Sequence, residues 1–297
     1  MDKGYQNSRE LSLGGFNDLI KGRYGWMVFN KNDLVIGKSI KEYGEWSQLE
    51  LDFLTQLLNP NDVVIEIGSN IGSHTIPFSK ILKKGHVYGF EPQNIIFQNL
   101  CANLSLNSIT NCICERVAIS DSRNEKLFMM NFDSNKSNNF GNASLLNSKS
   151  DDSFPVEVDV LDNRFSYLKN LKLLKLDVEG NEINALKGGE NLIKRTKPFL
   201  YLENDRLKNS QDLIEYIFTL DYKLFWHIPP LFNKKNFFKN KNNIFQSQYS
   251  FNMFGFHKDL QLKTDLFEIK DSNCHPMDKK YSDFFTMNNL GVFIQKN

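Results

Sequence analysis

The chain has 297 residues, 40% of them hydrophobic and 13% aromatic, which is enough apolar material for the core of one large α/β domain. Its formal net charge of +1 gives no overall field that would attract a polyanion, so the composition makes no strong case for nucleic-acid binding. The four cysteines of so large a chain are expected to be reduced thiols, and Cys112 and Cys114 have no nearby partners for a zinc site, so we predict no bound metal.

Residues 1–10 lack the apolar segment of a signal peptide, and no stretch of the sequence resembles a membrane-spanning helix, so we expect a cytoplasmic protein. We predict a main domain over residues 51–258, an N-terminal extension over 1–50 that packs on it, and a C-terminal extension over 259–297 whose role the sequence leaves open. A basic run with phenylalanines, residues 234–241, is interpreted as a solvated loop anchored by its aromatic side chains. Contact of this run with a base or sugar ring is the alternative.

The first strand of the predicted core covers residues 63–67, an almost continuous apolar run that is typical of a central parallel strand. It enters a turn whose glycines allow a sharp bend and a close approach of the backbone to a ligand. The turn is formed by Glu66, Gly68, Asn70 and Gly72, each separated from the next by one residue.

The spacing in this turn differs from the Gly-x-Gly-x-x-Gly order that holds a pyrophosphate. An acid beside the turn suits the cationic sulfonium and ammonium groups of S-adenosylmethionine. The turn therefore predicts S-adenosylmethionine as the cofactor, and a strand-to-helix turn that binds nothing is the alternative.

A second strand is predicted over residues 86–90, after a helix over 71–82. It ends at Glu91, which follows Glu66 at about the separation at which an α/β nucleotide site places its ribose-binding carboxylate. Pro92 ends the strand and biases Glu91 toward extended geometry. Glu91 is therefore a candidate ligand of the ribose hydroxyls, and a surface acid before a turn is the alternative.

A third strand is predicted over residues 112–121, after a helix over 94–106. The ligand of a doubly wound sheet lies across the carboxyl ends of its strands. The backbone near Val117 and Ala118 is therefore expected to form the adenine wall, an assignment that rests on position alone.

Two strand-like segments follow, at residues 126–132 and 154–161, with the polar segment 134–144 between them. This segment is predicted to be a loop and not a separate domain. Loops of this length in compact domains are often functional, so it is a candidate substrate lid, and simple disorder is the alternative.

A fourth strand, residues 171–176, runs into Asp177 and Glu179. Because side chains alternate along a strand, we expect these two carboxylates to share one face and to point into the crevice, as a base or a substrate clamp. Acids that merely start the following helix are the alternative. A fifth strand, residues 198–205, ends in further polar residues that include Glu203. The acids thus gather where a doubly wound sheet opens its ligand crevice.

A last apolar strand, residues 222–227, ends in His227, whose side chain titrates near neutral pH. His227 is a candidate base for an acceptor hydroxyl. A structural histidine packed among aromatic residues is the alternative.

Several of these motifs together resemble the FkbM-type family of S-adenosylmethionine-dependent methyltransferases. The resemblance covers roughly residues 23–258 and is carried by segments 62–75, 90–92, 177–180 and 202–205, with weaker matches at 43–47, 225–230 and 250–253. It implies a class I methyltransferase fold, an α/β Rossmann-like doubly wound sheet of seven strands that is mostly parallel with the last strand antiparallel. It also implies methylation of a hydroxyl, often on a sugar or a secondary metabolite.

The resemblance also implies roles for single residues of this chain. Thr75 is expected to reach the methionine carboxylate of the cofactor, and Glu66 stands where many members have Asp, which keeps the charge with a longer reach. Residues that the resemblance implies to bind the cofactor are Glu66, Gly68, Asn70, Gly72, Thr75 and Glu91. Pro92, Val117 and Ala118 are predicted to bind it from their positions at the ends of the strands. Residues implied to bind the acceptor are Glu45, Glu203 and Asn204.

The predicted reaction is an in-line displacement in which an acceptor oxygen attacks the sulfonium methyl group, with Asp177, Glu179 and His227 as candidate bases. The predicted partner is a small-molecule or glycan acceptor, and the sequence leaves the oligomeric state open. A nicotinamide-dependent oxidoreductase shares the doubly wound sheet and is one alternative. A module that binds S-adenosylmethionine without turnover is another.

Overall fold

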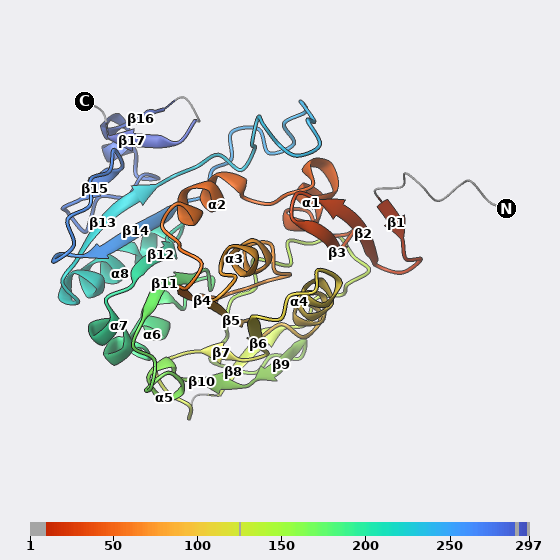
Figure 1. The fold of residues 1–297 in the computed structure, drawn as a ribbon, viewed down its shortest axis with the longest axis horizontal. Coiled ribbons are helices and arrows are strands. Elements are labelled where there is room, and N and C mark those ends of the chain that lie inside the picture. The colour runs from red at the N-terminus through yellow and green to blue at the C-terminus, as the bar shows by residue number, and fades with distance from the viewer. Residues whose placement is uncertain (1–9, 125, 289–290, 296–297) are drawn as a thin grey trace.

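The computed structural model describes residues 10–124, 126–288 and 291–295, so residues 1–9, on which the expectation of no signal peptide rests, lie outside the described residues. Its centre is a sheet with the strand order β15-β13-β14-β12-β11-β4-β5-β6 (Figure 1). The strands are β4 (Val63–Ile67), β5 (His86–Phe90), β6 (Cys112–Glu115), β11 (Leu171–Leu176), β12 (Phe199–Glu203), β13 (Tyr222–His227), β14 (Asn252–His257) and β15 (Phe267–Ile269).

The central sheet confirms the predicted fold class. Strands β6, β5, β4, β11 and β12 are mutually parallel, and β14 lies antiparallel between β12 and β13. The expected number of seven strands is wrong, since the described residues place eight in this sheet. The additional strand, β15, comes from the C-terminal segment and pairs with β13.

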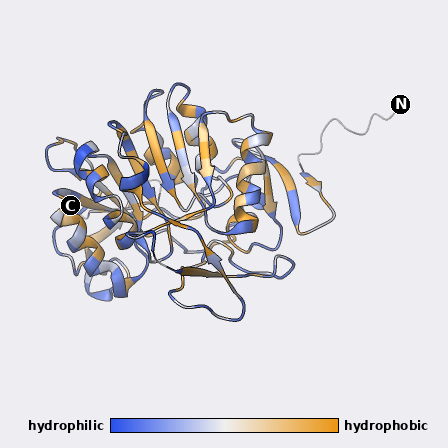
Figure 2. Cartoon of the chain, turned by 90° about the horizontal axis from the view of Figure 1, so that it is seen from below, coloured by the Kyte–Doolittle hydropathy of each residue, from blue (hydrophilic) through white to orange (hydrophobic). Residues whose placement is uncertain are grey.

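Helices cover both faces of the sheet. Side chains alternate along a strand, so one set of alternate residues packs against one helix layer and the other set packs against the opposite layer. In β4, Val63, Ile65 and Ile67 face the layer of α5–α8, whereas Val64 faces α2 and α3. Figure 2 shows the central strands as mostly hydrophobic, as strands covered on both faces must be. The helices are α2 (Gln48–Thr55), α3 (Thr75–Ile81), α4 (Asn94–Leu106), α5 (Leu161–Arg164), α6 (Glu182–Lys187), α7 (Glu190–Thr196) and α8 (Leu207–Thr219).

Two predicted elements have different bounds in the structure. The helix expected over residues 71–82 begins at Thr75, because Asn70 and Gly72 have φ angles of 47° and 89°, which a right-handed helix does not allow. The strand expected over residues 112–121 is broken after Glu115.

The residues beyond Glu115 turn away from the central sheet and form smaller sheets. Strand β7 (Ala118–Ile119) pairs in parallel with β10 (Val158–Asp159). Strands β8 (Leu127–Met130) and β9 (Ser153–Val156) form an antiparallel pair beside it, and the predicted loop lies between them.

The N-terminal segment forms a small sheet and one helix at the β6 end of the central sheet (Figure 1). These elements are β1 (Glu10–Ser12), β2 (Asn17–Gly22), β3 (Gly25–Asn30) and α1 (Ile36–Tyr43). The fully buried side chain of Asn103 on α4 connects them to the core. Its Oδ1 accepts the Val28 N–H at 2.6 Å, and its Nδ2 donates to the carbonyls of Val28 at 2.9 Å and Ile71 at 2.8 Å.

The C-terminal segment packs at the opposite end of the sheet, where β15 pairs with β13 (Figure 1). Trp226 Nε1 donates to the Cys274 carbonyl at 3.1 Å, and a ring nitrogen of His275 lies 2.9 Å from the Asn204 carbonyl. The segment ends in a 3-10 helix, Lys279–Phe284, and the pair β16 (Phe285–Met287) and β17 (Phe293–Gln295). The division into a main domain and two extensions stays a prediction. None of the described helices is long and apolar enough to cross a membrane.

Replacing Asn103 with Leu is expected to lower the free energy of unfolding by about 3 kcal/mol, because buried backbone groups of Val28 and Ile71 lose their partners. Denaturant unfolding followed by circular dichroism measures the change. Gln98→Leu, on the exposed face of the same helix, is the control and is expected to stay within about 0.5 kcal/mol of the wild type. A loss below about 1 kcal/mol for Asn103→Leu would contradict the role given to these bonds.

Candidate functional site

A cavity of about 340 Å³ lies at the carboxyl ends of β4, β5, β11 and β12, a volume typical of a small-molecule site. Strand order reverses between β4 and β11, which is where a doubly wound sheet opens its ligand crevice. The cavity brings together many of the residues predicted from sequence, namely Glu66, Gly68, Asn70, Glu91, Pro92, Val117, Ala118, Asp177, Glu179 and Glu203.

The turn after β4 needs its glycine for a steric reason. Gly68 has a φ of 85°, and a Cβ added there would lie 1.9 Å from the Asp177 carbonyl oxygen. Only glycine therefore lets this turn pass so close to the end of β11. Asn70 also adopts a left-handed conformation, which asparagine tolerates better than most residues, and its Oδ1 accepts the Ile71 N–H at 2.8 Å.

Glu91 connects the end of β5 to this turn. Its Oε2 accepts the Asn70 N–H at 3.0 Å, and its Oε1 accepts the Gln93 N–H at 2.8 Å. The residue is 4% exposed and lines the cavity. Burial raises the pKa of Glu91 to about 7, although both backbone hydrogen bonds oppose the shift. The carboxyl therefore shapes the turn as well as facing the cavity.

Glu66 lies at the end of β4 and is 1% exposed. Its Oε2 accepts the Thr75 hydroxyl at 2.6 Å. Burial raises the pKa of Glu66 to about 7, opposed by Lys175 and by the Thr75 hydrogen bond. Thr75 is fully buried and does not line the cavity in this structure, where its hydroxyl donates to Glu66, and its contact with the methionine carboxylate stays a prediction. Gly72 also lies outside the cavity wall, where a Cβ would meet Leu100 at 2.9 Å.

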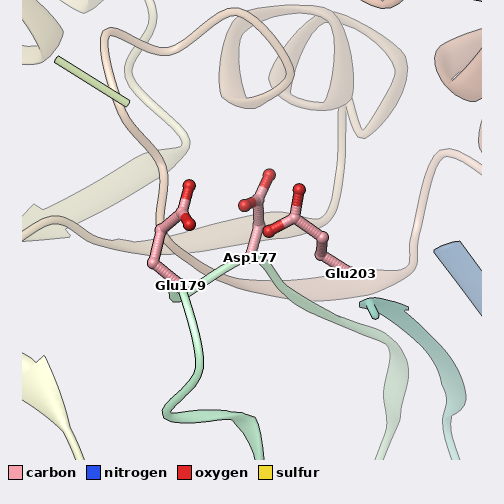
Figure 3. A group of neighbouring side chains, drawn as sticks. All are labelled: Asp177, Glu179 and Glu203. Atoms are coloured by element: carbon pink, nitrogen blue, oxygen red, sulfur yellow. The ribbon is translucent and has the colours of Figure 1, made fainter. Parts of the chain in front are cut away.

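Three carboxylates meet where β11 and β12 end (Figure 3). One oxygen from each of Asp177, Glu179 and Glu203 lies within 4.8 Å of the others. The expectation that Asp177 and Glu179 share one face of a strand is wrong, because β11 ends at Leu176 and both residues belong to the turn that follows. A left-handed φ of 56° at Glu179, and not strand alternation, turns its side chain toward its neighbours.

The charges in this cluster are only partly balanced. Arg206 Nη2 donates to Glu179 Oε2 at 2.6 Å, and Lys175 Nζ lies 3.4 Å from Asp177 Oδ2. Glu203 Oε2 is buried, and no donor from the described part of the chain forms a hydrogen bond with it. Burial, with the charge of Asp177 adding to it, raises the pKa of Glu179 to about 7 against the opposing effect of Arg206. Burial raises the pKa of Glu203 well above its usual range.

Carboxylates so close together also have the geometry of a possible cation site, and the absence of a metal stays a prediction of the sequence. The guanidinium of Arg206 already neutralises one of the three.

His227 lies away from the cavity wall. It is 3% exposed, it stacks on Phe53 with the ring centroids 4.5 Å apart, and its Nδ1 lies 2.7 Å from the Tyr201 hydroxyl. Burial lowers the pKa of His227 to about 3. Its role as a base stays a prediction, and the geometry favours the carboxylates.

Two residues expected to contact the acceptor also lie outside the cavity wall. Both carboxylate oxygens of Glu45 are occupied, since Oε2 accepts from Arg23 at 2.6 Å and from the Phe237 N–H at 2.8 Å, and Oε1 accepts from Asn233 at 2.7 Å. Asn204 is buried and donates to Ser210 Oγ at 2.8 Å. In this structure both residues hold the chain together around the site.

The loop at residues 134–144 lies over the cavity. Asn139, Gly141 and Ala143 line it, Gln93 Nε2 donates to the Phe140 carbonyl at 2.9 Å, and Ser144 Oγ donates to the Glu179 carbonyl at 3.0 Å. The loop thus contacts the acidic cluster directly. Movement of this loop as a lid stays a prediction.

Sequence reasoning missed several residues of the cavity wall. Lys175 is the most notable. Strand β11 contains two lysines, Lys172 and Lys175, and only the structure shows that Lys175 is the buried one that lines the cavity. His74 also lines the cavity, and none of the residues that the structure describes forms a hydrogen bond with its buried Nε2. Others are ring-bearing or apolar side chains brought in from distant segments, namely Trp46, Leu231, Tyr249, Phe251 and Met277, and no local pattern marks them.

The central sheet is doubly wound, carboxylates line the cavity at its switch point, and a glycine-containing turn follows β4. Together these features define a class I methyltransferase domain. The sequence profile of the methyltransferase FkbM domain matches residues 66–228, more than half of the chain. The chain belongs to the FkbM methyltransferase family, and S-adenosylmethionine is its cofactor.

Three known proteins illustrate the similarity. The chain is 34% identical over 71 residues to the tRNA(Phe) (4-demethylwyosine(37)-C(7)) aminocarboxypropyltransferase of Methanocaldococcus jannaschii, a match over 23% of this chain and 28% of that protein. A methyltransferase FkbM structure from Methylobacillus flagellatus has 17% identity and a TM-score of 0.44, over 67% of this chain and 44% of that one. TYW2 of M. jannaschii, in complex with AdoMet, has 14% identity and a TM-score of 0.43, over 83% and 89% of the two chains.

The residues present fit this cofactor. The turn at Gly68 leaves backbone open to the cavity, and the buried carboxyls of Glu66 and Glu91 supply negative charge for a cationic ligand. His74 Nε2 is a further buried polar atom in the wall, and within residues 10–124, 126–288 and 291–295 it has no hydrogen-bond partner.

We expect the affinity for S-adenosylmethionine to increase about tenfold from pH 5.5 to pH 7.5, because Glu66 and Glu91 lose their protons on passing through a pKa of about 7 and then attract the cation. Isothermal titration calorimetry measures this change. S-Adenosylhomocysteine, which lacks the sulfonium charge, is the control and should show a weaker dependence. Equal pH profiles for the two ligands would contradict the prediction.

Proposed function

We propose that this chain transfers a methyl group from S-adenosylmethionine to a hydroxyl oxygen of a sugar, a glycan or another small metabolite. The observation that carries the proposal is the carboxyl group of Glu179, which has a pKa of about 7 and lies beside Asp177 at the switch point. A base with a pKa near the working pH is the one best suited to accept a hydroxyl proton.

S-Adenosylmethionine supplies an activated methyl group, so that a C–O bond forms to the acceptor as the C–S bond breaks. The residues of this chain then have two tasks, to hold the acceptor oxygen in line and to receive its proton. Orientation alone contributes on the order of 7–11 kcal/mol in favourable cases. We assign proton acceptance to Glu179, with Asp177 as the second candidate.

We assign the two ends of the cavity to the two substrates. The end formed by the turn after β4, Glu91, Pro92, Val117 and Ala118 suits the cofactor, because these residues follow the three strands on one side of the switch point. The end formed by Glu203 and the segments that precede β14 then receives the acceptor.

The charge of the cavity wall supports a neutral or cationic acceptor. Among the described residues that line the cavity, Lys175 is the one lysine. Six acidic residues line the cavity with it, namely Glu66, Glu91, Asp177, Glu179, Glu203 and Asp205. An acidic wall repels a phosphorylated acceptor, which also supports the expectation that nucleic acid is not the substrate. Trp46, Tyr249 and Phe251 supply rings that suit the apolar face of a sugar or other ring.

A domain that binds S-adenosylmethionine without turnover is the alternative that remains. Membership of the methyltransferase family favours the first proposal over a nicotinamide-dependent oxidoreductase. A cytoplasmic location stays a sequence-based prediction.

The proposal is tested by incubating the protein with S-adenosylmethionine carrying a labelled methyl group and with acceptors in matched pairs. Each pair has one neutral or amino-bearing polyhydroxylated compound and the phosphorylated form of the same compound. Label on an oxygen of the unphosphorylated member supports the proposal. Transfer to nitrogen or carbon, preference for the phosphorylated member, or cofactor binding without any transfer would each argue against it.

The Glu179→Gln variant is expected to lower kcat by about 10²–10⁴-fold with little change in the KM for S-adenosylmethionine, because it keeps the shape of the side chain and removes the base. Steady-state kinetics measure both constants. Glu215→Gln, an exposed exchange on α8, is the control and should leave kcat unchanged. An unchanged kcat in Glu179→Gln would remove Glu179 from the reaction and leave Asp177 as the candidate.

The Glu91→Gln variant is expected to weaken S-adenosylmethionine binding by at least about tenfold, because a charge-assisted hydrogen bond to ribose is worth about 1.5–3 kcal/mol. Calorimetry measures the affinity, and the exposed exchange Glu157→Gln is the control. Equal affinities in the two variants would place the ribose elsewhere.

A further inference from the structure

Lys175 is a buried cation inside the central sheet. It is 2% exposed, and in the register of β11 and β4 it stands directly beside Glu66. Its Nζ lies 3.8 Å from Glu66 Oε1 and 3.4 Å from Asp177 Oδ2, so one ammonium group bridges two carboxylates of the cavity wall.

The groups that face Lys175 come from β4, β12 and α2, from the turn after β11 and from the residue before α3. Tyr201 of β12 stands beside Lys175 in the strand register, and burial raises the pKa of its hydroxyl well above the usual range, so Tyr201 carries no charge at pH 7. Glu66 belongs to β4, Asp177 follows β11, and Glu50 on α2 is buried and accepts the hydroxyl of Ser47. His74 precedes α3, and burial, together with the charge of Lys175, lowers its pKa well below the usual range, so His74 is neutral at pH 7. The cation that serves these carboxylates is therefore Lys175.

The effect of Lys175 on Glu66 follows from their burial. Burial favours the protonated form of Glu66, and the neighbouring ammonium group opposes it. Without that cation, Glu66 and Asp177 would be two nearby acids with no counter-ion, and Glu66, the more buried of the two, would keep its proton at neutral pH. A protonated Glu66 offers no charge to a cationic ligand.

We propose that Lys175 is a positioning residue that acts through Glu66, and that it raises the fraction of this side chain in the carboxylate form, so that the site meets the sulfonium cation with more negative charge. The inference rests on the proposed function, because it takes S-adenosylmethionine as the ligand. In this proposal Lys175 does not contact the reacting atoms. Lys175 changes how far Glu66 is protonated. It therefore changes the preference of the site for S-adenosylmethionine, which carries the sulfonium charge, over S-adenosylhomocysteine, a neutral thioether.

The test compares the affinities of the protein for S-adenosylmethionine and S-adenosylhomocysteine by calorimetry between pH 5.5 and pH 8.5. The ratio of the two affinities isolates the sulfonium charge. In the wild type this ratio should rise through pH 7, where Glu66 and Glu91 both titrate, and the part of the rise that depends on Lys175 belongs to Glu66. In Lys175→Met the midpoint should move upward by at least about one pH unit, and the ratio at pH 7 should fall about tenfold.

Lys172→Met is the matched control, since Lys172 lies on the same strand with its Nζ 4.7 Å from the centre of the Phe199 ring and outside the cavity. It should leave the midpoint unchanged. A residue that only fills space would change both affinities equally, so an unchanged midpoint in Lys175→Met would overturn the inference.

A second measurement needs no variant of Lys175. The side-chain carboxyl carbon of Glu66, assigned in the ¹³C NMR spectrum by its loss in Glu66→Gln, should titrate near pH 7 in the free wild-type protein. A midpoint above about pH 8 would show that Lys175 does not hold the carboxylate form, and would overturn the inference even if Lys175→Met does not fold. Failure of the wild type to bind S-adenosylmethionine at any pH would overturn the proposed function instead, and this titration would still report on Lys175.

Discussion

The reversal of strand order between β4 and β11 is the constraint on which the rest of this structure depends. At this point the connections leave in opposite directions along the sheet, so the carboxyl ends of the two strands stay open to a ligand. The turn after β4 passes so close to the end of β11 that Gly68 has no room for a Cβ beside the Asp177 carbonyl. The cofactor turn and the acidic turn are therefore one packed unit, and a shift in one moves the other.

Burial of carboxyl groups is the second property of the site. Glu66, Glu91 and Glu179 all have pKa values raised to about 7, and in each case burial is the largest cause. Groups that titrate near neutral pH change their charge in response to a ligand at little cost, which suits a site that binds a cation and releases a neutral product. Lys175 and Arg206 limit how far these shifts go, because each lies beside one of the acids.

Segments outside the central sheet complete the cavity. The N-terminal segment contributes Trp46, and its neighbour Glu45 joins Arg23 to the segment that precedes β14. The C-terminal segment contributes Met277 and is attached through the hydrogen bond from Trp226 to the Cys274 carbonyl. The end of the cavity that we propose for the acceptor is thus built from parts of the chain that are far apart in sequence, whereas the end that we propose for the cofactor follows consecutive strands.

The sequence by itself determined β4, β5, β11, β12 and β13, the helix α4, Glu66 near the end of β4 and the acids that follow β5 and β11, because apolar runs, turns and polar strand ends are local patterns. It also indicated the cofactor, since the order of glycines and acids in the turn after β4 is local too. Tertiary structure decided which of these side chains meet. It broke the strand expected beyond Glu115, turned Glu179 by a left-handed backbone, and buried His227 against Phe53 away from the cavity. It also placed Lys175 beside Glu66, because a cross-strand neighbour is set by the register of two strands more than a hundred residues apart, which no local pattern contains.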